Sequence, residues 1–225
     1  MRYAIISDVH SNLHALERVL KDADAQGADV IICAGDLVGY CPFPNEVVSE
    51  LKARGAICIA GNHDRACVNL DTFNMNPLAA NAIFWTVKHI SNASMTYLKR
   101  LKPQATLNLG GTVAAMFHGS PRMDDEYVFE EDANAEMLQL AKAQIVISGH
   151  THVPYVKRIP EGMLVNPGSV GQPRDGDPRA SYLIYDEWKQ GFMLRRVEYP
   201  VEEASKAVFS AGLPDFLGER LLSGI

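Results

Sequence analysis

The chain of 225 residues has no apolar run long enough to cross a membrane. Its longest hydrophobic stretches have the length of a strand, well short of the ~20 residues that a transmembrane helix requires. The first residues, Met1 to Ile6, follow a strand pattern and lack the charged head, apolar middle and small-residue cleavage site of a signal peptide. We therefore expect a cytoplasmic protein that has no membrane partner.

Basic runs, internal repeats, linkers and low-complexity segments are also missing from the sequence. The formal net charge is −6 and no stretch is rich in lysine or arginine, so we expect no binding to nucleic-acid duplexes. With 47% hydrophobic and 21% charged residues, the composition is typical of a folded globular protein. We predict a single domain that covers residues 1–225.

Cysteine is scarce, with four residues and no Cys-x-x-Cys pair of the kind that binds zinc or performs redox chemistry. Cys33 and Cys58 lie inside apolar runs and fit a role as small core residues. We interpret all four as reduced thiols, in agreement with the expected compartment.

Strand-sized apolar runs alternate with amphipathic helical segments in the first quarter of the chain. The expected elements are strands over 3–7, 29–34 and 56–60 and helices over 13–26 and 44–54. Asn12 fits the N-cap of the first helix, and Gly27 fits its C-terminal stop. Short joints between such elements favour a parallel sheet covered by helices.

The remainder of the chain mixes helices with short strands. Helices are expected over 77–90, 94–101 and 130–142, with two weaker ones inside 201–222. Strands are expected over 104–109, 112–118, 144–148, 153–159, 163–165, 180–185 and 192–197. The second half of the chain therefore favours a mixed or antiparallel arrangement.

Five polar clusters follow predicted strands at the point where each strand ends. They are Asp8-Val9-His10, Gly35-Asp36, Gly61-Asn62-His63-Asp64, His118-Gly119-Ser120 and Gly149-His150-Thr151-His152. Open α/β sheets bind ligands at this edge. We expect Asp8 and His10 to lie on extended backbone, which would direct both side chains the same way, as would hold for His150 and His152. Each cluster alone fits a turn or a cap, but together they indicate ligands aimed at one point.

The mixture of imidazole and carboxylate groups suits Mn, Fe, Co, Ni or Zn better than a calcium or magnesium cage. The candidate ligand atoms outnumber the about four that one zinc ion takes. They suit two divalent ions that share a bridging carboxylate. His14 and His89 fall in helical segments outside the clusters, and we expect them to be structural or exposed.

The ordered blocks D-x-H, G-D, G-N-H-D, H and G-H-x-H resemble those of the calcineurin-like metallophosphoesterases. The resemblance covers residues 1 to about 185. Residues 35–40 and 166–174 are similar to the small bacterial branch often compared with diadenosine-tetraphosphatases and phosphodiesterases, although Cys41 stands where glycine is more usual. The resemblance implies an α/β fold (α+β by some schemes), a four-layer α-β-β-α sandwich with a dinuclear metal site at the C-terminal edge of the sheets.

The resemblance also implies a role for each matching residue. One ion would be held by Asp8, His10, Asp36 and His152, and Asp36 would bridge to a second ion held by Asn62, His118 and His150. His63 would lie over the cleft and assist the phosphate or the leaving group, with Asp64 orienting its ring. These roles imply a phosphodiesterase or phosphatase in which a hydroxide shared by two ions attacks phosphorus.

The sequence says less about the substrate, which we expect to be a small phosphoester or a nucleotide-like molecule. The candidate contacts beside the ligands are Asn62, Tyr40, Arg65, Arg122 and Arg174. Arg122 and Arg174 could clamp a phosphate by bidentate hydrogen bonds, and Tyr40 could stack on a base or aryl group. Two alternatives stay open: a dinucleoside polyphosphate hydrolase, and a non-catalytic metal-binding scaffold, which would not need His63. The sequence leaves the oligomeric state and the identity of the ions open.

Overall fold

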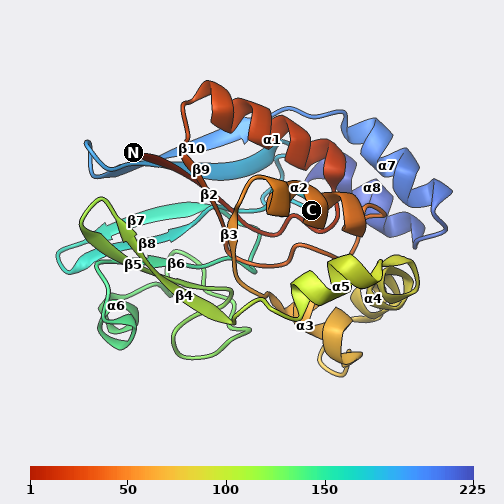
Figure 1. Cartoon of the computed structure of the whole chain (residues 1–225), viewed down its shortest axis with the longest axis horizontal. Coiled ribbons are helices and arrows are strands. Elements are labelled where there is room, and N and C mark those ends of the chain that lie inside the picture. Colours follow the sequence, from red (N-terminus) through yellow and green to blue (C-terminus); the bar gives the residue numbers. More distant parts are fainter.

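A computed structural model describes all 225 residues, in which two five-stranded mixed sheets face each other and helices cover their outer sides (Figure 1). The first sheet contains β1 (Arg2–Ile6), β2 (Val30–Cys33), β3 (Ile57–Cys58), β9 (Ala180–Asp186) and β10 (Gly191–Val197). Its strand order is β10-β9-β1-β2-β3. Strands β1, β2 and β3 run parallel, β9 is antiparallel to β1, and β10 is antiparallel to β9.

The second sheet differs from the first in that its parallel strands are central and both of its edge strands are antiparallel. It contains β4 (Gln104–Leu109), β5 (Thr112–Phe117), β6 (Ile145–Ile147), β7 (Tyr155–Ile159) and β8 (Gly162–Asn166). Its order is β4-β5-β6-β8-β7, in which β5, β6 and β8 are parallel. The two sheets together thus contain six parallel strands, and the loops after their C-terminal ends position the site described below.

Eight helices accompany the sheets. They are α1 (Leu13–Ala25), α2 (Pro44–Ala53), α3 (Asn62–Asn69), α4 (Pro77–His89), α5 (Asn92–Leu98), α6 (Ala135–Ala141), α7 (Val201–Ser210) and α8 (Asp215–Ser223). Helices α1, α2, α7 and α8 lie on the outer side of the first sheet, and α6 lies on the outer side of the second (Figure 1). None of the helices combines the length and the apolarity that spanning a membrane requires.

Buried apolar residues form a cluster on each face of the sandwich and a third between the sheets. The middle cluster includes Ile5 and Ile32 from the first sheet and Met116 and Ile147 from the second. Central strands such as β1 and β5 alternate their side chains between this layer and the helical layer outside it. The predicted four-layer α-β-β-α sandwich is confirmed, whereas the assignment of the whole chain to one domain stays a prediction.

Most of the expected elements are present with bounds shifted by one or two residues. The side chain of Asn12 accepts a hydrogen bond from the backbone N–H of Ala15 and caps α1, as its sequence position predicts. Two expectations were wrong. The expected helix over 130–142 begins only at Ala135, capped by Asn134, and the short helix α3 was missed because Gly61-Asn62-His63-Asp64 resembles a turn.

Candidate metal centre

The seven candidate ligands lie directly after the parallel strands of both sheets. Asp8 and His10 follow β1, Asp36 follows β2, Asn62 opens α3 after β3, His118 follows β5, and His150 and His152 follow β6. All of them except Asn62 are buried. The parallel strand ends of both sheets meet at one edge of the sandwich, so segments far apart in the chain converge there.

One group of converging atoms comes from Asp8, His10 and His152. Their ligand atoms all lie within 4.8 Å of one another. His152 Nε2 lies 3.2 Å from Asp8 Oδ1 and 3.1 Å from His10 Nε2. This geometry brings two imidazole nitrogens and one carboxylate oxygen to a common point.

A second group comes from Asp36, His118 and His150, whose ligand atoms also lie within 4.8 Å of one another. His118 Nε2 lies 3.3 Å from Asp36 Oδ2 and 3.0 Å from the amide oxygen of Asn62. His10 Nε2 is 3.7 Å from Asp36 Oδ2, so the carboxylate of Asp36 lies between the two groups.

Backbone carbonyls fix which nitrogen of three histidines faces the cluster. In each ring Nδ1 lies against a carbonyl oxygen, which can only accept a hydrogen bond, so Nδ1 carries the proton. The pairs are His10 with Val38 at 3.2 Å, His118 with Ala34 at 2.8 Å and His152 with Gln172 at 2.5 Å. When these rings are neutral, the lone pairs of their Nε2 atoms point into the cluster, as metal-binding histidines require.

The unsatisfied atoms of the cluster fit divalent cations. Asp8 Oδ1 and Asp36 Oδ2 are buried and accept no hydrogen bond. The Nε2 atoms of His10 and His152 face each other, and two lone pairs at that distance need a proton or a cation between them. Carboxylate oxygens and imidazole lone pairs brought together in this way match the donor preferences of transition-metal ions.

The charges of Asp36 and His118 are strongly linked. Burial alone would lower the pKa of His118, but the carboxylate of Asp36 outweighs burial and raises that pKa to about 10. Burial would raise the pKa of Asp36, but His118 and His63 hold it well below its usual range. A proton and a cation therefore compete for His118 Nε2.

The backbone of the site is strained. Ten residues other than glycine have positive φ in the chain, and seven of them lie here: Asp8, His10, Ser11, Asp36, Tyr40, His150 and His152. Left-handed conformations of this kind cost free energy and persist only when their surroundings enforce them. The expectation that Asp8 and His10 lie on extended backbone was therefore wrong: their φ values are 53° and 48°, and tight loops direct their side chains inward.

Hydrogen bonds between the loops hold this conformation. The hydroxyl of Ser169 donates to the backbone oxygen of Asp8 at 2.7 Å, and the amide of Asn166 donates to that of Gly149 at 2.7 Å. The backbone N–H of His150 donates to Asp8 Oδ2 at 3.1 Å. The loop after β8 thus fixes the loops that carry both groups of candidate ligands.

The structure does not place Asp64 against His63, so the expected orienting contact was wrong. The Asp64 carboxylate instead accepts hydrogen bonds from the backbone N–H groups of Leu37, Val38 and Gly61 at 3.0–3.2 Å. Burial and the nearby Asp36 raise the pKa of Asp64 to about 7, which these three donors partly offset. Asp64 therefore ties the loop after β2 to the start of α3.

His63 lies at the cavity with its ring between those of His10 and Tyr40, and its ligand atom lies within 4.8 Å of those of His10 and Asp36. Its ring centroid is 4.7 Å from that of His10 and 4.5 Å from that of Tyr40, and its Nδ1 has no hydrogen-bond partner. Burial lowers its pKa to about 4, although Asp36 acts in the opposite direction. The ring packs against Gly39 so closely that a Cβ atom there would overlap it.

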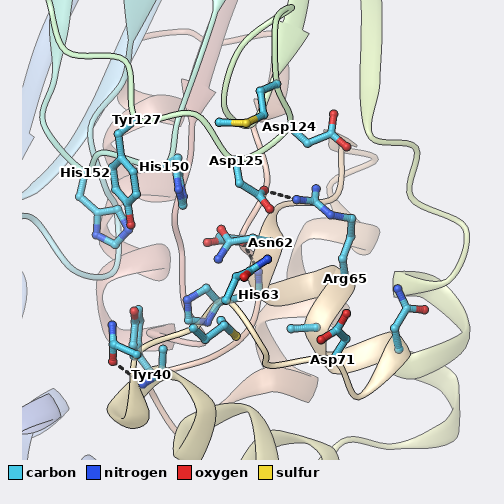
Figure 2. A pocket seen from close by; sticks show the side chains of 18 of the residues that line it. Tyr40, Asn62, His63, Arg65, Asp71, Asp124, Asp125, Tyr127, His150 and His152 are labelled. Atoms are coloured by element: carbon cyan, nitrogen blue, oxygen red, sulfur yellow. Dashed lines mark hydrogen bonds and ion pairs between the residues drawn. The ribbon is translucent and has the colours of Figure 1, made fainter.

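A cavity of about 600 Å³ opens beside the cluster, and Figure 2 shows its lining. Of the expected substrate contacts, Tyr40, Asn62, Arg65 and Arg174 line it. Arg65, however, forms an ion pair with Asp125 across the cavity (Figure 2). The side chain of Arg174 donates to two neutral groups, the hydroxyl of Tyr40 at 3.3 Å and the amide oxygen of Gln172 at 3.0 Å.

One expected contact was wrong and one residue was missed. Arg122 does not line the cavity, because its guanidinium is bound by Glu126 at 2.9 Å and Glu136 at 3.3 Å. Tyr40 lines the cavity but is only 3% exposed, and its ring lies 4.6 Å from that of His10, so its stacking on a base or aryl group stays a prediction. Tyr127 is 53% exposed and lies 4.0 Å from the ring of His150, although nothing in its sequence surroundings signals this position.

The comparisons with known proteins agree with this geometry. Residues 1–190 match the model of the calcineurin-like phosphoesterase superfamily domain. The chain is 36% identical to an uncharacterized protein of Methanocaldococcus jannaschii over 239 aligned positions, which cover 98% of this chain and 97% of that relative. It is also 36% identical to a metallophosphoesterase from Sphaerobacter thermophilus, whose crystal structure gives a TM-score of 0.86 and coverage of 100% and 99%. The phosphodiesterase YfcE of Escherichia coli is 25% identical over 197 positions, with coverage of 83% and 88%.

Proposed function

This chain belongs to the calcineurin-like phosphoesterase superfamily, and on that premise we propose that it is a metal-dependent phosphoester hydrolase. The observation that carries the proposal is the position of Asp36. Its carboxylate lies between two groups of buried ligand atoms, with one oxygen left without a hydrogen bond. A shared carboxylate of this kind suits two cations side by side.

The residues present would hold two divalent transition-metal ions. Asp8, His10, Asp36 and His152 would hold one, and Asp36, Asn62, His118 and His150 would hold the other. Manganese, iron, zinc, nickel and cobalt all suit these donors. Such ions lower the pKa of bound water towards neutrality and stabilise negative charge on a phosphoryl group.

His63 is the residue of this chain that we assign to the reacting groups. It lines the cavity, carries no hydrogen bond at Nδ1, and is neutral at pH 7 because its pKa is about 4. A neutral imidazole can donate its one N–H to a phosphoryl oxygen or to the leaving oxygen as the ester bond breaks. Gly39 provides the space for the ring in this position.

The volume of the cavity and the Arg174 guanidinium indicate the kind of substrate. A volume of about 600 Å³ suits a small phosphoester or a nucleotide-like molecule. Arg174 reaches the cavity without a carboxylate partner and is free to bind an anionic part of the substrate. A non-catalytic scaffold would require neither an arginine without a carboxylate partner at the cavity nor a buried His63 beside the candidate ligands.

A substrate panel tests the proposal. The purified protein, loaded in turn with Mn²⁺, Zn²⁺, Ni²⁺ and Co²⁺, is offered an aryl phosphodiester, an aryl phosphomonoester and a dinucleoside tetraphosphate. We expect hydrolysis of at least one substrate, loss of activity in chelator and recovery on adding metal. Protein that binds metal yet hydrolyses none of the three would contradict the proposal. The substrate preferred would separate a phosphodiesterase or phosphatase from a dinucleoside polyphosphate hydrolase.

A further inference from the structure

Tyr127 presents an open aromatic face to the cavity. Two tyrosines line the cavity, of which Tyr40 is buried and packs against the rings of His10 and His63, whereas Tyr127 is more than half exposed. The planes of the Tyr127 and His150 rings are inclined by 34° with their centroids 4.0 Å apart, so His150 covers one side of the tyrosine ring. The exposed area of Tyr127 therefore belongs to the other side and to the edge of its ring.

The loop after β5 is anchored on both sides of Tyr127. The preceding residue, Glu126, accepts hydrogen bonds from the hydroxyl of Ser120 and, at 2.9–3.2 Å, from the guanidinium of Arg122. The following residue, Val128, is buried in the apolar cluster on the outer side of the second sheet. The backbone of Tyr127 is therefore held in place before a ligand binds, which lowers the conformational entropy that binding would lose.

Gly119 lets this loop fold back onto the metal-centre edge directly after the candidate ligand His118. The backbone N–H of Gly119 donates to the backbone oxygen of Asp124 at 2.9 Å. A Cβ atom at Gly119 would lie only 2.5–2.6 Å from backbone atoms of the loop, which is too close for any other residue. This close turn brings Tyr127 back over His150.

The ring of Tyr127 lies next to the candidate ligands. His150, which it contacts, shares one group of converging ligand atoms with Asp36 and His118. Figure 2 shows Tyr127 beside His150, on the side of the cavity away from Arg65. A group esterified to a phosphate that is held at these ligands would therefore lie within reach of the open face of Tyr127.

An open aromatic face of this kind suits a planar group. Aromatic rings attract one another in offset-stacked and edge-to-face arrangements, and every nucleobase has a face that can stack on a tyrosine. The carboxylates of Asp71 and Asp124 also line the cavity. Carboxylates accept hydrogen bonds from the N–H groups at the edge of a base and repel a further anionic group, so the lining suits an uncharged planar group.

We propose that Tyr127 determines which esters the site accepts, because its open face binds a planar group of the substrate, either an aryl ring or a nucleobase. The inference rests on the proposed function and deepens it, because it names the substrate class as phosphoesters of aryl or nucleoside alcohols. Tyr127 belongs to none of the three apolar clusters of the fold, so the packing of the core does not account for an aromatic ring at this position.

Titration calorimetry on the full chain loaded with Mn²⁺ tests this role through binding rather than turnover. The probes are phosphonates, which the protein cannot hydrolyse as esters, in two matched pairs. One pair compares phenylphosphonate with cyclohexylphosphonate, and the other compares the methylenephosphonate analogue of adenosine 5′-phosphate with that of ribose 5-phosphate. We expect at least one planar probe to bind about fivefold more tightly than its non-planar partner, as stacking on an aromatic ring provides. The pair that shows this ratio tells whether the planar group is an aryl ring or a base.

Variants decide whether the ring of Tyr127 causes that ratio. In Tyr127→Leu we expect the ratio to fall to about 1–2, with the metal content and the affinity for the non-planar partner unchanged. Tyr127→Phe keeps the ring without its hydroxyl and is expected to keep most of the ratio. Trp188→Leu, which removes an exposed aromatic ring outside the cavity, is the matched control and should behave as the unmodified protein.

Several outcomes would overturn the role of Tyr127. They are an equal affinity within both pairs or no binding of either planar probe, a ratio that Tyr127→Leu leaves unchanged, and an equal loss in Tyr127→Phe, which would assign binding to the hydroxyl. If Tyr127→Leu loses metal or weakens the binding of all four probes alike, Tyr127 supports His150 and does not bind the planar group. Protein that shows the expected ratio yet hydrolyses no ester would contradict the proposed function alone.

Discussion

The metal-centre edge and the layer between the two sheets both consist of buried side chains, but they differ in chemistry and in backbone. Between the sheets, Ile5, Ile32 and Leu183 are fully buried apolar groups on regular strands. At the edge, the buried groups are carboxylates and imidazoles on left-handed loops, and Asp8 and Asp36 keep oxygens without hydrogen bonds.

The difference indicates that the layer between the sheets stabilises the fold, whereas the metal-centre edge destabilises it. Burial of apolar surface between the sheets stabilises the fold, by roughly 25 cal/mol per Å² removed from water. Each left-handed residue at the edge costs about 1 kcal/mol or more, and unpaired buried charge costs more still. We therefore expect substitutions at the metal-centre edge to lower activity and substitutions between the sheets to lower stability. The following changes test this expectation.

The largest effect is expected from Asp36→Asn. Because Asp36 lies between both groups of ligand atoms, its loss should lower the metal content to one ion or fewer per chain and the hydrolysis rate by more than ~10⁴-fold, roughly 5.5 kcal/mol of transition-state stabilisation. Metal analysis and kcat/KM check both. Asp24→Asn, at an exposed carboxylate paired with Arg54, is the control. A variant that keeps two ions and normal turnover would contradict the shared role.

His63→Ala should act on the rate alone. We expect a loss of ~10²–10⁴-fold in kcat, with the metal content unchanged, because the ring assists the reaction and does not hold an ion. His89→Ala, at an exposed histidine stacked on Trp85, should leave the rate unchanged. Loss of metal together with activity would show instead that His63 is a ligand, in line with its position near His10 and Asp36.

Ile5→Ala should show the reverse separation in the layer between the sheets. Removing a fully buried side chain there should lower the free energy of unfolding by about 2–5 kcal/mol, while kcat/KM measured well below the melting temperature stays within about twofold. Ile57→Ala, at a residue 40% exposed in the same sheet, should lower the free energy of unfolding by well under half as much. Equal losses of stability in both variants would remove the contrast between core and surface.

Asp22, a carboxylate with hydrogen-bond partners outside the metal centre, extends the comparison to the pH dependence of stability. Asp22 accepts from the hydroxyl of Tyr182 at 2.6 Å and from Arg195 at 2.9 and 3.1 Å. Burial would raise its pKa, but Arg195 and Tyr182 hold it below the usual value of 3.8. Its stabilisation is therefore complete above about pH 4 and is lost as the pH falls through the lowered pKa.

Denaturant unfolding of the unmodified chain and of Asp22→Asn at pH 7 and pH 3 measures this contribution. We expect the difference in unfolding free energy between the two proteins to shrink at the lower pH, because the unmodified carboxyl then takes up a proton. A difference that does not change with pH would mean that Asp22 contributes through packing alone.

The smallest effect concerns the strained backbone. Ser7 and Ser11 are both buried with unpaired hydroxyls, but only Ser11 has a positive φ, of 56°. Ser11→Gly should therefore raise the free energy of unfolding by about 0.5 kcal/mol, because glycine relieves the left-handed strain. Ser7→Gly should lower it by a similar amount. Chemical denaturation compares the two, and a loss in both would show that the strain at Ser11 is negligible.

The sequence predicted the regular elements better than the loops between them. Hydrophobic runs identified the strands because their side chains are buried on both faces, as in β1 and β9. Helix α3 was missed because its first residues, Asn62 to Asp64, are typical of a turn. The start of the helix is tied to the loop after β2 by two carboxylates: Asp64 accepts from the backbone N–H of Leu37, and Asp36 accepts from that of His63. Such contacts between distant segments have no local sequence signal.

The candidate site could be predicted in composition but not in its contacts. Strand-end Asp, Asn and His residues marked the seven converging side chains, although the expected extended backbone for Asp8 and His10 proved to be left-handed. The position of Asp64 could not be predicted, since two of its three partners are backbone N–H groups 26 and 27 residues earlier in the chain. The contacts of Arg122 could not be predicted either, because its ion pairs with Glu126 and Glu136 depend on the fold of the loop after β5.

Anomalous diffraction from crystals of the Mn²⁺-loaded protein tests the shared role of Asp36 most directly. We expect two manganese peaks about 3.5–4 Å apart, as in two-metal sites, one on each side of the Asp36 carboxylate. One peak should be bounded by Asp8, His10 and His152, and the other by Asn62, His118 and His150. A single peak, or ions that do not contact Asp36, would contradict the two-ion centre.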